Sequence, residues 1–123
     1  MMIRALLCSL HSPDVLDLPS YHPPDPECFA FLLQLMVGST AGPGEESFDV
    51  FVCTPQWFVR SHAPTEIVSG HHKLIVFEYD YRRLESNLRK RVEATMGETW
   101  EEVARKLERI GGWEFADYVE ELR

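Results

Sequence analysis

The stretch SFDVFVCTPQWFV at residues 47–59 contains a change of period that decides how the middle of the chain folds. Residues 47–53 alternate with a period of two, which predicts a strand with one apolar face. Thr54 is a favoured helix N-cap, and Pro55 fits the first helical position, where its missing N–H costs nothing. The stretch therefore predicts a strand that passes directly into a short helix over residues 56–61.

Two more strands are predicted upstream of this junction. Residues 2–10 alternate well enough for a first strand, whereas residues 12–26 hold five prolines and three aspartates, which predicts turns. Residues 28–37 (CFAFLLQLMV) are apolar on both faces, which predicts a central strand. Its side chains facing one layer would be Phe29, Phe31, Leu33 and Leu35. The block GSTAGPGEES at 38–47 predicts a long hairpin connection, because its glycines and proline separate two strand-like runs.

Downstream of the junction the sequence predicts one strong strand and one weak one. Residues 73–80 (KLIVFEYD) have strand composition. The short run TEIVSG at 65–70 is a candidate partner for them, joined through a turn around Gly70. The total is four strands, or five if residues 65–69 form one.

The last third of the chain has helical periodicity. Asp80 is a good N-cap for a first helix, which Gly97 would end. Thr99 and Glu102 have the spacing of a capping box, in which each side chain satisfies an unpaired backbone N–H, and a second helix follows. Residues 113–122 (WEFADYVEEL) predict a third, short helix.

Strands that precede helices, without strand–helix alternation, predict an α+β fold in one domain over residues 1–123. We expect a mainly antiparallel sheet of four to five strands, a short helix after the third strand, and C-terminal helices packed on one face. The tryptophans Trp57, Trp100 and Trp113 are expected to anchor the core, because each lies at or next to a predicted helix start.

Composition and charge limit the partners that the protein can have. The 123 residues are 45% hydrophobic and 26% charged, which is typical of a soluble globular domain. The formal net charge of -8 disfavours nucleic acid and favours a basic protein partner. The apolar run near the N-terminus is too short for an export signal, and no run approaches a membrane span. Three cysteines without CxxC spacing suit a reducing compartment, so we expect a cytoplasmic protein.

No set of residues has the spacing of an active site or a metal site. Cys53 precedes a helix start but lacks a recognisable base, so it is interpreted as the last residue of its strand. The histidines His62, His71 and His72 lack ligand spacing, and no cofactor or metal is predicted. The basic run at 89–91 is interpreted as a helix face balanced by neighbouring glutamates.

Acidic residues in two loops are the candidate partner-binding residues. Residues 1–50 hold seven carboxylates and one base, Arg4. Clustered carboxylates on loops can recognise a basic protein. The chief candidates are Glu45, Glu46 and Asp49, and the second group is Asp14, Asp17, Asp25 and Glu27.

Three stretches stand out together: ESFDVFVCTPQWF at 46–58, LIVFEYDY at 74–81 and TWEEVARKLERIGGWEFADY at 99–118. They resemble the Imm8 family of bacterial immunity proteins, which belong to polymorphic toxin systems. FLLQLMVG at 31–38 and SPD at 12–14 add to the match, so that the resemblance covers nearly the whole chain. It implies a small α+β protein, made beside a secreted toxin, that binds and neutralises that toxin without catalysis.

Two other functions stay open from the residues alone. One is an intracellular module that binds a peptide or small molecule on the second, apolar face of the sheet. The other is a cysteine-dependent hydrolase centred on Cys53. The residues themselves agree with a stoichiometric inhibitor, which needs a compact acidic domain and no catalytic group.

Overall fold

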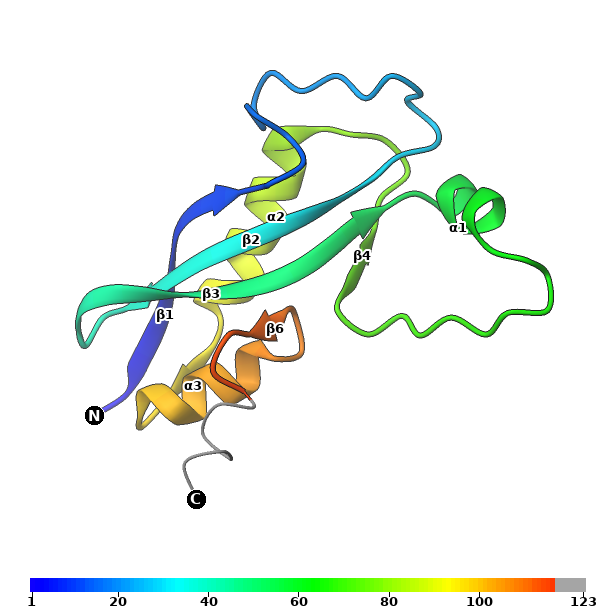
Figure 1. Cartoon of the computed structure of the whole chain (residues 1–123). Helices are drawn as coiled ribbons and strands as arrows, with labels where there is room; N and C mark the ends of the chain where they lie inside the picture. The colour runs from blue at the N-terminus through cyan, green and yellow to red at the C-terminus, as the bar shows by residue number, and fades with distance from the viewer. Residues whose placement is uncertain (117–123) are drawn as a thin grey trace.

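The computed structural model describes residues 1–116, which form one curved sheet with two helices on one of its faces (Figure 1). The described residues contain six strands in the order β4-β3-β2-β1-β5, with β6 also paired to β3. The α+β class predicted from the sequence is confirmed. The sheet is mixed, however, because β4 runs parallel to β3.

The hairpin of β2 (Ala30–Ser39) and β3 (Gly42–Cys53) is the centre of the sheet. Its register runs from Ala30 opposite Cys53 to Val37 opposite Glu46. Only residues 40–41 separate the two strands, so the predicted long connection over 38–47 is wrong. The glycines and the proline fall where the ladder is irregular, between Val37 opposite Glu46 and Ser39 opposite Gly42, and pairing resumes before the turn.

On one side of the hairpin lies β1 (Ile3–His11), which pairs antiparallel with β2 and has an irregularity between Leu7 and Ser9. β5 (Met96–Gly97) pairs antiparallel with the start of β1. On the other side, two short strands share the outer edge of β3. β4 (Lys73–Ile75) pairs in parallel with residues 51–53, and β6 (Gly112–Trp113) pairs antiparallel with residues 48–49.

The predicted strand at 65–69 does not form, and residues 73–80 shorten to the three residues of β4. After α1 (Pro55–Ser61) the chain returns through an irregular segment, so that it re-enters the sheet parallel to β3. The free edge of β3 then supplies the hydrogen bonds that a hairpin with 65–69 would have supplied. Val76 N–H donates to the carbonyl of Cys53 at 2.9 Å, and Phe51 N–H donates to the carbonyl of His72 at 2.8 Å.

The predicted helix starts are confirmed at three positions. Thr54 caps α1, Asp80 caps α2 (Tyr81–Glu93) and Thr99 caps α3 (Trp100–Leu107), each by accepting a backbone N–H of the first turn. α2 ends before the predicted terminator Gly97, which belongs to β5. Trp113 lies in a strand and not at the start of a helix, because it pairs with Phe48, and the rest of the predicted helix at 113–122 falls largely outside the described residues.

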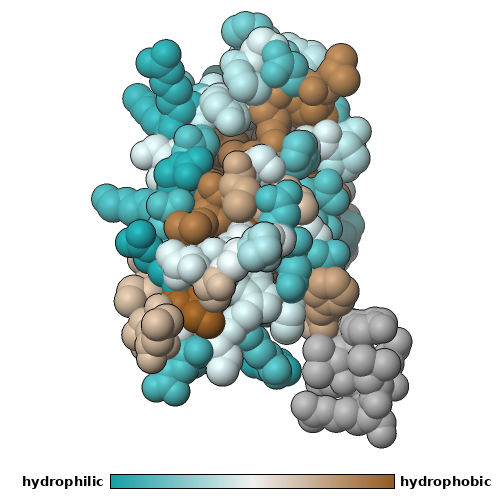
Figure 2. All heavy atoms as spheres, turned by 90° about the vertical axis from the view of Figure 1, so that its left-hand side faces the viewer, coloured by the Kyte–Doolittle hydropathy of each residue, from teal (hydrophilic) through white to brown (hydrophobic). Residues whose placement is uncertain are grey.

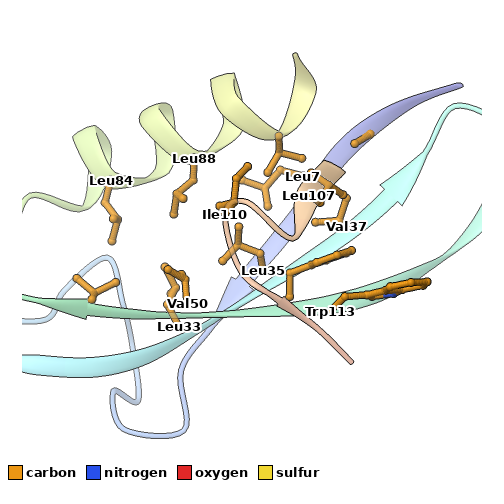
Figure 3. Close-up of a cluster of buried hydrophobic side chains, with 14 of the residues drawn as sticks. Leu7, Leu33, Leu35, Val37, Val50, Leu84, Leu88, Leu107, Ile110 and Trp113 are labelled. Atoms are coloured by element: carbon orange, nitrogen blue, oxygen red, sulfur yellow. The ribbon is translucent and has the colours of Figure 1, made fainter. Parts of the chain in front are cut away.

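The core lies between one face of the sheet and the helices α2 and α3, and Figure 3 shows Leu84 and Leu88 of α2 over the sheet. Alternate residues of β2 and β3 point into it, and the predicted inward set of β2 is confirmed. α2 contributes Leu84, Leu88 and Val92, and α3 contributes Val103 and Leu107. Complete burial of one such side chain stabilises the fold by about 1.5–3 kcal/mol.

The three tryptophans differ in their burial. Trp113 is 8% exposed and stacks on Phe48 with ring centroids 6.4 Å apart. Trp100 is half-buried and meets Phe48 edge-on. Trp57 is a correction to the predicted core set, because α1 buries none of its residues and the Trp57 ring packs against Phe51 outside the main core.

Candidate partner-binding site

The acidic residues predicted to bind a partner are spread along the β2–β3 hairpin, with Asp49 between the other members, and do not form one patch. Glu45 and Glu46 lie in β3 next to the turn. The second group, Asp14, Asp17, Asp25 and Glu27, lies in the segment that joins β1 to β2. That segment enters β2 at Ala30, opposite Cys53, at the far end of the hairpin (Figure 1). Glu46 lies opposite Val37 and Asp14 bonds to Leu32, so about five strand residues, roughly 17 Å, separate the nearest members of the two groups.

Glu46 is held inside the fold by two tryptophans. Its carboxylate accepts a hydrogen bond from Trp100 Nε1 at 2.9 Å and another from Trp113 Nε1 at 2.7 Å. Each indole N–H needs an acceptor when it is buried, and a lost acceptor costs about 1–3 kcal/mol. A substitution at Glu46 would therefore change folding as well as any partner contact.

Glu45 is exposed on the opposite face of β3 from Glu46, since side chains alternate along a strand. It lies near Cys8, whose pKa is raised by burial and by a hydrogen bond to the Glu45 carboxylate. Gly38 makes this approach possible, because a Cβ there would lie 3.0 Å from the Gly44 carbonyl oxygen and 3.1 Å from Cys8 Sγ. A depression of about 660 Å³ beside Glu45 also has Glu114 in its wall.

Asp49 lies halfway along β3, opposite Gln34 of β2. Burial raises the pKa of the Asp49 carboxyl, Gln34 lowers it in part, and the charge of Glu114 raises it further. Within residues 1–116 the Oδ1 atom of Asp49 is buried and has no hydrogen-bond partner. A carboxylate in this position destabilises the protein, because its buried oxygen has lost water without gaining a donor.

The second acidic group stabilises the segment between β1 and β2. Asp14 accepts the backbone N–H of Leu32 at 2.8 Å, and Asp17 accepts the hydroxyl of Ser20. Asp25 accepts the N–H of Glu27 and pairs with Arg60 of α1 at 3.0 Å. These contacts lower the pKa of Asp25. Glu27 is exposed at this end of the hairpin.

The residues that could suggest catalysis have structural surroundings. Cys53 is fully buried, and burial raises the pKa of its thiol although Lys73 partly opposes the shift. A reactive cysteine needs exposure and a lowered pKa, so Cys53 is a poor nucleophile. His72 contacts the carbonyl of Glu108 at 2.7 Å. The expected balance of the basic run is confirmed, since Arg89 pairs with both Glu85 and Glu93.

One surface was missed by the sequence reasoning. Ile75 and Phe77, in and after the edge strand β4, are 51% and 80% exposed, and Ile67 in the preceding segment is fully exposed. A groove of about 430 Å³ lies beside them, between the 74–80 segment and α2. The run KLIVFEYD has the composition of a buried strand, so the sequence carries no signal that its side chains reach solvent.

Side chains on the view in Figure 2 form separate apolar groups among hydrophilic ones, without a continuous apolar surface. No helix within residues 1–116 has both the length and the apolar character needed to cross a membrane. Among the same residues, no three histidine, cysteine or acidic side chains are grouped to hold a metal ion.

These features define a small α+β protein whose distinctive surface groups are charges and an apolar sheet edge. The family model described as Immunity protein 8 matches residues 5–118, and the chain therefore belongs to the Imm8 immunity-protein family. No curated protein and no solved structure matches the chain.

Proposed function

We propose that this protein binds a cognate secreted toxin domain in the bacterial cytoplasm and neutralises it by forming a stoichiometric complex. The observation that carries the proposal is the match to the immunity-protein family over residues 5–118. The raised pKa and complete burial of Cys53 favour binding over cysteine chemistry. The toxin is expected to be basic, since the protein has a net charge of -8 and would steer a basic partner toward itself.

The test uses the gene neighbour. The C-terminal domain of a secreted protein encoded beside this one is purified and titrated with the immunity protein by isothermal titration calorimetry. In a second experiment, the toxin domain is expressed in bacterial cells with and without the immunity protein. We expect a 1:1 complex and protection of bacterial cells that express the toxin domain. Protection without a complex would contradict the proposal, as would a complex that leaves the toxin active. Binding of a small metabolite with no effect on the toxin would favour the binding-module alternative.

The exposed carboxylates are proposed to speed capture of the toxin. Glu45→Lys should slow association and flatten its dependence on salt, because rim charges act mainly on the association rate over a Debye length of about 8 Å. Glu46 is left unchanged because it holds Trp100 and Trp113. The measurement is stopped-flow association at several salt concentrations.

Glu101→Lys on α3 is the matched control, since it makes the same change of charge at another exposed site. An equal slowing by both variants would mean that only net charge matters. Wild-type association by Glu45→Lys would remove the hairpin from the capture surface. Asp49, Asp14, Asp17, Asp25 and Glu27 remain proposed partner-binding residues.

A further inference from the structure

β4 is an edge strand in which the N–H of Lys73 bonds to the carbonyl of Gly70, whereas the outward backbone groups of Ile75 lack a partner in the described chain. In a parallel ladder, alternate residues of a strand direct both N–H and C=O to the neighbouring strand. His72 and Val76 bond to β3 in this way, so Ile75 between them directs its N–H and C=O outward. No described residue pairs with these two groups of Ile75. A free N–H and C=O at a sheet edge can pair with another strand.

Two side chains at this edge are apolar and exposed, and Lys73 of β4 lies beside them. Ile75 and Phe77 are spaced by two residues, as on one side of a strand, and expose 51% and 80% of their surface. Ile67 is fully exposed in the segment that leads to β4. Monomeric proteins usually protect an edge strand with charge, proline or a covering element, and an edge that keeps apolar side chains often marks an interaction site.

A groove runs along the core side of the same edge. Its apolar wall consists of Val52, Leu74, Val76 and Leu84, from β3, the β4 segment and α2, and its volume is about 430 Å³. At its mouth Arg83 pairs with Glu78 at 3.0 Å and with Asp80 at 3.5 Å. The groove is open because the sheet stops at β4. A strand added beyond β4 would place alternate side chains over the groove and over Ile75.

We propose that the outer edge of β4 is the docking site for the toxin, which adds an extended strand of its own to the sheet and places an apolar side chain in the groove beside it. This inference rests on the proposed function. Strand addition gives affinity through backbone hydrogen bonds, and the groove gives specificity through one side chain.

Charge favours a basic toxin strand over a second copy of this chain. Two copies would each carry a net charge of -8 over the whole chain, and like charges oppose association. The second acidic group lies at the same end of the sheet. Tyr79, just after β4, donates a hydrogen bond to the carbonyl of Leu18, and Arg60 holds Asp25 near α1. A toxin segment with basic residues flanking its apolar one would meet Glu78 and Asp80, which share Arg83 at the groove, and Asp17 beside Tyr79.

The test replaces Ile75 by proline. Proline removes the outward N–H of Ile75 but leaves the bonds of His72 and Val76 to β3, and it is tolerated at such edge positions. We expect Ile75→Pro to weaken binding of the neighbouring gene's toxin domain at least 100-fold, and Phe77→Ala to weaken it about tenfold, with melting temperatures near that of the wild type. Met96→Ala is the matched control, because Met96 is an exposed apolar residue on the opposite edge strand, β5.

Hydrogen exchange keeps the inference testable if Ile75→Pro fails to fold. The Ile75 amide of the wild-type protein should become protected in the toxin complex, while the Met96 amide should not change. Wild-type affinity of folded Ile75→Pro, or an unprotected Ile75 amide in a formed complex, would overturn the docking site while leaving the immunity function intact. Absence of any 1:1 complex with the wild type would instead refute the proposed function. A wild-type homodimer that Ile75→Pro dissolves would assign the edge to self-association and overturn the inference.

Discussion

Asp49 carries a carboxyl group where the protein disfavours a negative charge. Burial raises its pKa, the neighbouring Glu114 adds to the shift, and Gln34 offsets only part of it. In the unfolded chain the same carboxyl has its ordinary pKa of about 3.9. As the pH rises, the unfolded state therefore loses this proton first, and the free energy of unfolding falls until the folded state has also ionised.

Asp49→Asn should therefore raise the melting temperature at pH 7, because it removes the buried charge and keeps the shape of the side chain. The gain should shrink as the pH falls toward 4, where the wild-type carboxyl regains its proton. Thermal unfolding of both proteins between pH 4 and pH 8 measures the difference.

Asp25→Asn is a control for which we expect the opposite change in melting temperature. The backbone N–H of Glu27 and the Arg60 side chain lower the pKa of Asp25, so its stabilising effect is present at neutral pH and is lost in acid. This variant should melt below the wild type at pH 7.

For Asp49, the contradicting outcome is a wild type that is more stable than Asp49→Asn at pH 7. It would show that Asp49 makes a favourable contact as an anion.

Glu46 illustrates which part of the candidate site the sequence could not predict. Its acidity is evident from the sequence, but its partners Trp100 and Trp113 lie 54 and 67 residues away. No local spacing encodes such a contact. Caps are different, because Thr54, Asp80 and Thr99 each bind a backbone N–H three residues ahead, and all three could be predicted.

At the level of elements, α1 and β6 each present a tryptophan but differ in what surrounds it. Trp57 of α1 contacts the rings of Phe51, Phe58 and His62, all outside the main core. Trp113 of β6 is buried against Phe48 and bonded to Glu46. β6 is therefore attached to the core by its tryptophan, whereas the tryptophan of α1 packs outside the core.

Trp113→Ala should lower the free energy of unfolding by about 3–5 kcal/mol, since it leaves a cavity and removes a hydrogen bond of Glu46. Trp57→Ala should cost less than half as much, because its ring is partly exposed. Urea denaturation at equilibrium gives both values. Equal losses would place Trp57 in the core after all.

β4 shows why strand pairing was harder to predict than strand composition. The run that contains Leu74, Ile75 and Val76 is apolar enough to be recognised as a strand. Whether it pairs with the segment before it or with β3 depends on the path of α1 and the irregular segment that follows, which residue composition does not encode. The predicted hairpin between residues 65–69 and 73–80 is therefore wrong, although residues 73–75 do form a strand.

For the whole molecule, the periodicities were sufficient for the α+β class and for helices on one face of the sheet. They could not give the strand order, in which both β4 and β6 occupy the outer edge of β3. Nor could they give the exposed apolar edge, because exposure depends on which neighbour is missing. The site predicted from charge and the site inferred from the edge consequently involve different residues.

The order in which these strands form should be measurable in folding kinetics. The β2–β3 hairpin closes through a two-residue turn, whereas Trp113 reaches Glu46 across 67 residues. Closing a long loop costs more entropy, so distant contacts tend to form late. In stopped-flow experiments Val50→Ala should mainly slow folding, and Trp113→Phe should mainly speed unfolding. Slower folding in Trp113→Phe, with unfolding unchanged, would reverse this order.

The shared outer edge of β3 also matters while the chain is being made. When the hairpin emerges during synthesis, residues 48–49 pair with β2 on one side, but on the outer edge of β3 they have no partner strand until Gly112 and Trp113 appear. The nascent protein thus carries an open strand edge flanked by Phe48 and Val50 until β6 has been made, and such edges recruit other chains into aggregates. Gly112 and Trp113 close that edge, so the short strand β6 also protects the solubility of a newly made molecule.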